Sequence, residues 1–321
     1  HKRHVAAVGF DRDDMTMSPI TYDEMRPGCY EPKARVDDMV MNHVEASLCF
    51  PSFPRFCGQT FYERKDHDLG DLCVKAYNDW MLDEWCAPSG GRLIPLIIIQ
   101  LWDPVKAAAE IRRNAARGCH AVTFSEIPPF LGLPSVHDSG GFWDPFFAAC
   151  EDTNTVVCMH IGSSSKMPST SADAPPAVSS TLTYMNAAMS LTDWLMSGVF
   201  ERFPELQVCW IETGVGWLPH LMECLDDRWW RNRVWGDLPI SEPPSFYWYR
   251  NNAASFIVDR SGIELRHRAG VKNIMWSSDY PHHGNDWPYS RKVIEESMGS
   301  IPEAEKALIV GGNAARIWGV D

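Results

Sequence analysis

The chain has 321 residues, of which 45% are hydrophobic and 22% are charged, and its formal net charge is −13. This composition is ordinary for a globular enzyme with a sizeable core, but the acidic balance argues against a nucleic-acid partner, because binding phosphates needs a basic surface. No apolar run reaches about 18 residues, so we expect no membrane span and no membrane partner.

The first 42 residues, which open with HKRHVAAVGF, show no clear first element, and we expect an irregular segment over 1–42. Ten cysteines are scattered along the chain without a C-x-x-C pair. No signal peptide is visible. Together these features predict reduced thiols in a cytoplasmic protein.

From residue 43 onward, short apolar runs alternate with amphipathic helical stretches. The run RLIPLIIIQL has no polar alternation, as expected for a strand buried on both faces. The helix after it starts at an Asp-Pro pair and stops at a glycine, which are typical helix boundaries. The predicted strands span residues 43–50, 92–101, 120–126, 155–162, 206–214, 255–259 and 273–279. The predicted helices span residues 68–86, 103–118, 144–153, 182–204, 217–232 and 262–270, followed by two more near the end of the chain.

About seven such strand–helix units indicate parallel pairing with right-handed crossovers. The number is close to the eight of a (β/α)8 TIM barrel, which takes roughly 250 residues or more. A doubly wound sheet is the alternative, but the chain has neither a G-x-G-x-x-G turn after a strand nor a Walker A motif. We therefore predict a single TIM-barrel domain over 1–321, with the Pro-rich stretches 163–178 and 236–248 as long loops.

Polar side chains end several of the buried runs. Glu126, His160, Glu212 and Asp279 each lie at the end of a predicted strand, and Asp279 is followed closely by His282 and His283. In a barrel the carboxyl ends of the strands form one face, where the active site is built. One imidazole and three carboxylates on one rim are ligand chemistry for a divalent metal with an accompanying acid or base.

Each of these residues also has a purely structural interpretation. His160 could be a core histidine with its hydrogen bonds satisfied, and Glu126 could pair with an arginine. Glu212 could cap the following helix, and Asp279 could form an Asx turn before Tyr280-Pro281. Their shared position at strand ends favours the functional interpretation.

Four segments of the sequence resemble the amidohydrolase-2 family, the branch of the amidohydrolase superfamily that contains aminocarboxymuconate semialdehyde decarboxylase. They are CMHIGSSS, WIETGVGWLPHLMECLD, MWSSDYPHHGNDWP and GGNAARIWGVD. The resemblance covers nearly the whole chain from about Arg26 onward. It implies a distorted TIM barrel with one divalent metal ion, zinc in the first place or manganese.

By this resemblance His160 matches the metal ligand that ends the fifth strand of the family's barrel, and Asp279 matches the carboxylate that ends the eighth. Glu212 stands where the family's decarboxylases place a histidine, which is a departure from their pattern. The family's first-strand ligand pair has no match in residues 1–42. We expect that strand to lie upstream of the chain, with loss of the ligands as the alternative.

The substrate would be a small molecule. Arg55 is a candidate clamp for a substrate carboxylate, with a surface cation as the alternative. Phe53, Trp102 and Trp287 are predicted near the same rim, where they would favour a flat substrate, and Glu126 is a further candidate for contact with it.

Three hypotheses follow for the function. The first is metal-dependent, non-oxidative decarboxylation of a small aromatic or unsaturated acid, with Asp279 or His282 as the acid and Glu212 beside them. The second is metal-dependent hydrolysis of an amide or lactone, in which Asp279 accepts a proton from water. The third is a metal-free or non-catalytic barrel. The resemblance also implies a homodimer, for which the aromatic-rich stretch 226–235 is the candidate surface, with packing of Trp229 and Trp230 onto the barrel as the alternative.

Overall fold

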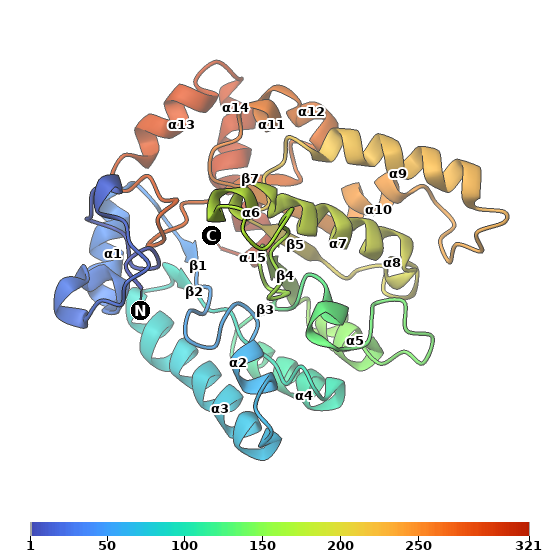
Figure 1. The fold of residues 1–321 in the computed structure, drawn as a ribbon, viewed down its shortest axis with the longest axis horizontal. Helices are drawn as coiled ribbons and strands as arrows, with labels where there is room; N and C mark the ends of the chain where they lie inside the picture. Colours follow the sequence, from blue (N-terminus) through green and yellow to red (C-terminus); the bar gives the residue numbers. More distant parts are fainter. Residues whose placement is uncertain (1, 321) are drawn as a thin grey trace.

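In the computed structural model, which describes residues 2–320, seven parallel strands lie at the centre of a ring of helices (Figure 1). Five of them form one sheet in the order β3-β4-β5-β6-β7, and β1 pairs with β2. A single bridge between Ile97 and Val122 joins the two groups. The strands are β1 (Ser47–Leu48), β2 (Leu93–Ile94), β3 (Ala121–Thr123), β4 (Val156–His160), β5 (Val208–Ile211), β6 (Asn252–Phe256) and β7 (Ile274–Trp276).

Helices follow the strands and cover the outside of the sheet (Figure 1). The helices are α1 (Pro32–Met41), α2 (Gln59–Tyr62), α3 (His67–Trp80), α4 (Pro104–Ala115), α5 (Asp144–Asp152), α6 (Pro176–Leu182), α7 (Tyr184–Met196), α8 (Val199–Arg202), α9 (Leu218–Asn232), α10 (Pro244–Asn251), α11 (Arg260–Glu264), α12 (Arg266–Ala269), α13 (Ser290–Met298), α14 (Glu303–Ala307) and α15 (Asn313–Trp318). No helix among residues 2–320 is long and apolar enough to cross a membrane.

The alternating order predicted from the sequence is present, since every predicted strand overlaps an observed one. Pairing is parallel throughout, with β4 and β5 in register from Val157 opposite Val208 to His160 opposite Ile211. Within the described residues β1 and β7 are not paired with each other, so the sheet is not closed.

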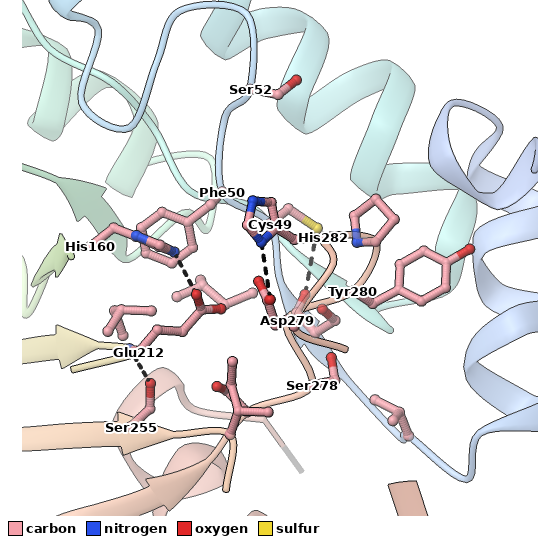
Figure 2. A pocket seen from close by; sticks show the side chains of 18 of the residues that line it. Cys49, Phe50, Ser52, His160, Glu212, Ser255, Ser278, Asp279, Tyr280 and His282 are labelled. Carbon is pink, nitrogen blue, oxygen red and sulfur yellow. Dashed lines mark hydrogen bonds and ion pairs between the residues drawn. The ribbon is translucent and has the colours of Figure 1, made fainter. Parts of the chain in front are cut away.

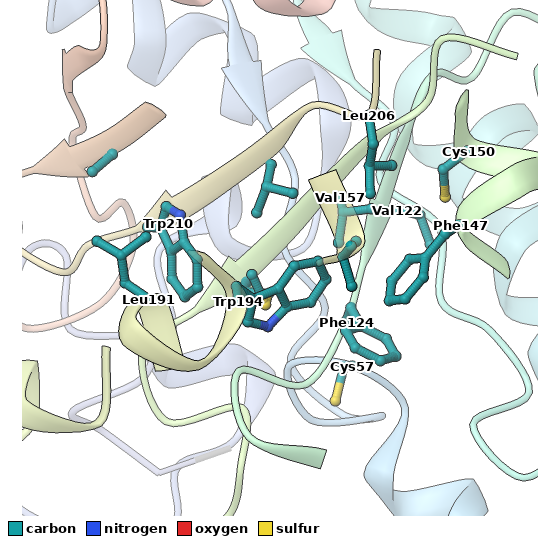
Figure 3. Packing of buried hydrophobic residues seen from close by; sticks show 14 of the residues in the cluster. Cys57, Val122, Phe124, Phe147, Cys150, Val157, Leu191, Trp194, Leu206 and Trp210 are labelled. Atoms are coloured by element: carbon teal, nitrogen blue, oxygen red, sulfur yellow. The ribbon is translucent and has the colours of Figure 1, made fainter. Parts of the chain in front are cut away.

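The main core lies between the sheet and helices α5 and α7 (Figure 3). Trp194 of α7 is at its centre, with ring centroids 5.4 Å from Phe147 and 6.3 Å from Trp210. All three side chains are buried. Each fully buried large side chain stabilises the fold by about 1.5–3 kcal/mol, so this cluster fixes the strands whose ends carry the polar residues.

The segment 1–42, which we expected to be irregular, contains the ten-residue helix α1. Pro32 occupies its first position, where a missing backbone donor costs nothing. The helix was missed because its sequence, PKARVDDMVM, lacks a clear apolar stripe. The side of the helix that faces the interior carries two charged residues, Arg35 and Asp38, and is therefore not an apolar face.

Candidate active site

The carboxyl ends of β4, β5 and β7 bring three of the predicted residues together (Figure 2). His160 is the last residue of β4, Glu212 directly follows β5, and Asp279 lies three residues beyond β7. His160 Nε2 is 3.1 Å from Glu212 Oε2. Parallel strands end at the same edge of a sheet, which is why residues far apart in the sequence meet here.

His160 is held in one orientation. Its Nδ1 lies 2.7 Å from the carbonyl oxygen of Ile161, so Nδ1 is the donor and Nε2 faces Glu212. The ring of Phe56 stacks on the imidazole at 4.1 Å, and Phe50 meets it edge-on at 5.1 Å. Burial alone would lower the pKa of His160, but the charge and hydrogen bond of Glu212 raise it above its usual value.

Glu212 has a left-handed backbone with a φ of 60°, which turns its side chain into the site. Its backbone N–H donates to Ser255 Oγ on β6 at 2.8 Å. Burial acts to raise the pKa of Glu212, but His160 outweighs it and lowers the pKa overall. Each of the two side chains therefore favours the charged form of the other.

Asp279 also has a left-handed backbone, with a φ of 51°. Such a conformation costs a non-glycine residue about 1–3 kcal/mol and persists only where its surroundings hold it. The backbone N–H of His282 donates to the Asp279 carbonyl at 2.7 Å, and His282 Nδ1 is 3.2 Å from Asp279 Oδ2. Burial, with the nearby charge of Glu212, raises the pKa of Asp279 to about 6, against the opposing hydrogen bond from His282.

These residues line a large open cavity of 2410 Å³. Its wall near His160 is mostly apolar and aromatic, which suits a flat organic substrate. The apolar and aromatic residues that line the cavity include Phe50, Phe53, Phe56, Ile161, Met167, Ile257 and Trp276, of which Phe50 and Phe56 contact His160.

Arg55 and Phe53 lie on this wall, as the sequence predicts. Arg55 has a φ of 62°, and its guanidinium is tied to Glu63 at 2.8 Å and to the hydroxyl of Ser165. It is one cation of the wall that a substrate carboxylate could contact, although Glu63 already neutralises part of its charge.

Glu126 is not among the lining residues of this cavity. Its Oε1 accepts hydrogen bonds from Gly162 N at 3.0 Å and from Ser164 Oγ at 2.8 Å. The carboxylate thus holds the turn that follows His160, and no arginine pairs with it among the described residues. Burial raises the pKa of Glu126.

Trp102 and Trp287 are also absent from the cavity wall. Trp102 stacks on His67 at 4.6 Å, on the helix side of the sheet. Trp287 donates from Nε1 to the carbonyl of Asp38 at 3.0 Å and packs against Arg26. The prediction that these two side chains lie near the substrate is therefore wrong, because Trp102 packs on His67 of α3 and Trp287 on Arg26 and α1.

The donor chemistry at the site suits a divalent cation, since His160 Nε2 and the Asp279 carboxylate are ligand types for zinc and manganese. Within residues 2–320, however, no group of three or more His, Cys, Asp or Glu side chains has the arrangement of a metal site. The described residues therefore supply part of a coordination shell and do not complete one.

Ser255 and Phe50 are site residues that the sequence did not single out. Ser255 supports Glu212 from the neighbouring strand, and Phe50 contacts His160. Strands buried on both faces have no alternation that separates inward from outward side chains. The one usable signal was the position of Phe50, at the end of the first predicted strand.

The amidohydrolase family model matches residues 3–320, and the chain belongs to this family. No match was found among the curated proteins. Among solved structures, the chain resembles 5-carboxyvanillate decarboxylase from Sphingomonas paucimobilis, with 24% identity and a TM-score of 0.69 over 95% of this chain and 84% of that one.

Two further similar structures have TM-scores of 0.71 and 0.72. The 2,6-dihydroxybenzoate decarboxylase from Rhizobium is 19% identical over 89% of this chain and 88% of its own. The 5-carboxyvanillate decarboxylase from Novosphingobium aromaticivorans, complexed with manganese and 4-hydroxy-3-methoxy-5-nitrobenzoic acid, is 18% identical over 89% of this chain and 79% of its own. At these identities the likeness establishes the fold, so the predicted TIM-barrel class is confirmed, although β1 and β7 do not close on each other.

Proposed function

We propose that the chain is a decarboxylase that removes carbon dioxide, without oxidation, from a small aromatic or unsaturated carboxylic acid. The observation that carries this proposal is the meeting of His160, Glu212 and Asp279 at the strand ends, beside the aromatic rings of Phe50 and Phe56. The likeness to decarboxylases of 5-carboxyvanillate and 2,6-dihydroxybenzoate supports it.

The reaction needs a proton donor at the carbon that loses its carboxylate. Protonated Asp279 gives its proton to that carbon, the bond to the carboxylate breaks, and its electron pair restores the unsaturated ring as carbon dioxide leaves. His282, hydrogen-bonded to Asp279, then returns a proton to it. The Glu212 carboxylate holds the imidazole of His160 in place.

A divalent metal ion belongs to this proposal, with zinc and manganese as the candidates. His160 and Asp279 would hold it, with waters or further donors completing the shell. When bound, the ion would draw electron density from the substrate carboxylate and an adjacent oxygen. Arg55 would bind a second polar group of the substrate.

We further propose a cytoplasmic location, based on the ten unpaired cysteines, and self-association as a homodimer. Both proposals are independent of the chemistry at the site. The surface for the homodimer is the aromatic stretch 226–235.

The test is a panel of hydroxybenzoates and hydroxyisophthalates, supplied with Mn²⁺ or Zn²⁺ and scored for carbon dioxide release. We expect turnover of at least one acid, about one metal ion per chain by plasma mass spectrometry, and loss of both metal and turnover in His160→Ala. Asp279→Asn should lower kcat by about 10²–10⁴-fold. His220→Ala, an exposed histidine on α9, is the matched control.

Amides and lactones are the second arm of the panel, because Glu212 stands where the family's decarboxylases carry histidine, and a carboxylate is a competent base for water. Bond opening in that arm, without carbon dioxide release in the first, would replace the proposal with hydrolysis. Inactivity in both arms together with no bound metal would favour a non-catalytic barrel.

A further inference from the structure

The segment that carries Asp279 is fastened to helix α1 of the N-terminal part of the chain. Asp38 Oδ2 accepts a hydrogen bond from the hydroxyl of Tyr280, the residue directly after Asp279. Two more contacts follow along the segment, from Trp287 Nε1 to the Asp38 carbonyl at 3.0 Å and between Asn42 and Ser290 at 2.8 Å. Three contacts thus join α1 and the residue after it to the loop that follows β7 and to the first residue of α13.

Burial and hydrogen bonds fix the position of the Asp38 side chain. The side chain is only 4% exposed and accepts from Arg26 through Nη2 at 2.6 Å and Nε at 2.8 Å. Charge-assisted, two-point contacts of this kind fix geometry as well as energy. A Cβ at Gly28 would overlap both Asp38 Oδ2 and the Tyr280 hydroxyl, so the backbone itself closes around the pair.

The aromatic ring of Tyr280 is fixed from another side. The Arg35 guanidinium lies 4.3 Å from its ring centroid, while Arg35 Nε donates to the Gly28 carbonyl at 2.6 Å. Arg35 is buried. Neither the hydroxyl nor the ring of Tyr280 is therefore free to move without disturbing α1.

Asp279 needs such support, because its left-handed backbone is unfavourable for a residue with a side chain. On the cavity side, a Cβ at Gly284 would overlap Asp279 Oδ2, so a side chain at this position would displace the carboxylate. We propose that Asp38 and Tyr280 are positioning residues, which hold the Asp279 carboxylate at its place in the cavity through the peptide link to Tyr280.

This inference rests on the proposed function only for its effect on rate, since the position of Asp279 can be measured without any substrate. The rate would fall because an acid displaced by about 0.5 Å is no longer correctly positioned to transfer its proton to the reacting carbon. Substrate binding elsewhere in the cavity would be unaffected, so kcat should change more than KM.

The first variant is Tyr280→Phe, which removes one hydroxyl and keeps the ring. Its matched control is Tyr289→Phe, in which the same atom is removed from an exposed tyrosine that is not among the residues of the three contacts. Gly284→Ala is the reference for displacement, because the added methyl group must push the Asp279 carboxylate directly.

Crystal structures of these variants should show the Asp279 carboxylate displaced by about 0.5 Å or more, or in two conformers, in Tyr280→Phe and in Gly284→Ala but not in Tyr289→Phe. In Tyr280→Phe we expect kcat and the affinity for Mn²⁺ to fall about tenfold, with KM within about twofold of the wild type. Asp38→Asn should give the same changes, and the double variant with Tyr280→Phe should be no worse than either single variant.

An unmoved carboxylate with unchanged kcat would overturn the proposal, whatever happens to the melting temperature. If no acid is turned over by the wild type, the proposed function fails, while the crystallographic comparison still decides the positioning role.

Discussion

Glu126 shows how a strand-end carboxylate can serve a site without facing it. The residue follows β3, and its Oε1 accepts from the backbone of Gly162 and the hydroxyl of Ser164 just after His160. Burial makes the ionised form of a carboxylate unfavourable, and it is the largest cause of the raised pKa of Glu126. Its contribution is therefore to the shape of the turn and not to the charge of the cavity.

This assignment predicts a pH-dependent gain in stability for Glu126→Gln. The pKa of Glu126 is higher in the folded than in the unfolded chain, so the folded state loses stability as pH rises from about 4.3 through the raised pKa. Glutamine keeps an accepting oxygen but cannot ionise. We expect the variant to melt about 2 °C above the wild type at pH 8 and to show little gain at pH 4, measured by calorimetry.

Glu84→Gln is the control, because Glu84 is exposed and its neutralisation removes no buried charge. A destabilised Glu126→Gln at both pH values would mean that the ionised carboxylate is needed, as expected for direct contact with substrate or metal.

At the level of secondary structure, the sequence predicts elements best where local chemistry determines them. Helix α4 begins at Pro104 because the Asp103 side chain accepts from Val105 N and Lys106 N, both at 3.0 Å, and these residues can be read directly from the sequence. Strand β4 is equally plain, since its apolar run VVCM is typical of a buried strand, and all five residues of the strand are buried.

Other elements depend on contacts that no local pattern reveals. The predicted helix 182–204 divides into α7 and α8 at Gly198, whose φ of 75° ends one helix and starts another. The apolar run 92–101 gives only a two-residue strand, because Asn78 of α3 takes over the backbone pairing of Ile98, with two bonds of 2.9 Å.

The same limit applies to the site. His160, Glu212 and Asp279 could be predicted because strand ends meet by topology. The hydrogen bond between Asp38 and Tyr280 joins residues 242 positions apart, and Asp38 lies on a helix that the sequence did not predict. The direction in which Trp102 and Trp287 turn was likewise decided by helices that pack against them.

On the scale of the whole molecule, the end of α9 and the segment that follows it lie at one edge of the ring of helices (Figure 1). Trp230, Val234 and Trp235 are 64%, 89% and 76% exposed. Exposed aromatic clusters of this kind mark interaction surfaces. We predict that they form the homodimer contact and that Trp235→Glu shifts the protein to a monomer in analytical ultracentrifugation.

Val105→Glu is the matched control, because Val105 is 66% exposed on α4 and belongs to no such cluster. A wild-type monomer, or a dimer that Trp235→Glu leaves intact, would contradict this surface as the contact.

The most direct test of the decarboxylase assignment is to detect proton transfer to the product. The acids of the substrate panel are incubated with the enzyme in deuterium oxide, and the products are analysed by NMR. We predict that the product carries one deuterium on the carbon that held the carboxylate, and that Asp279→Asn slows its appearance by about 10²–10⁴-fold. Carbon dioxide release at the same rate in Asp279→Asn would remove Asp279 as the acid. A wild type that leaves every acid intact would contradict decarboxylation itself.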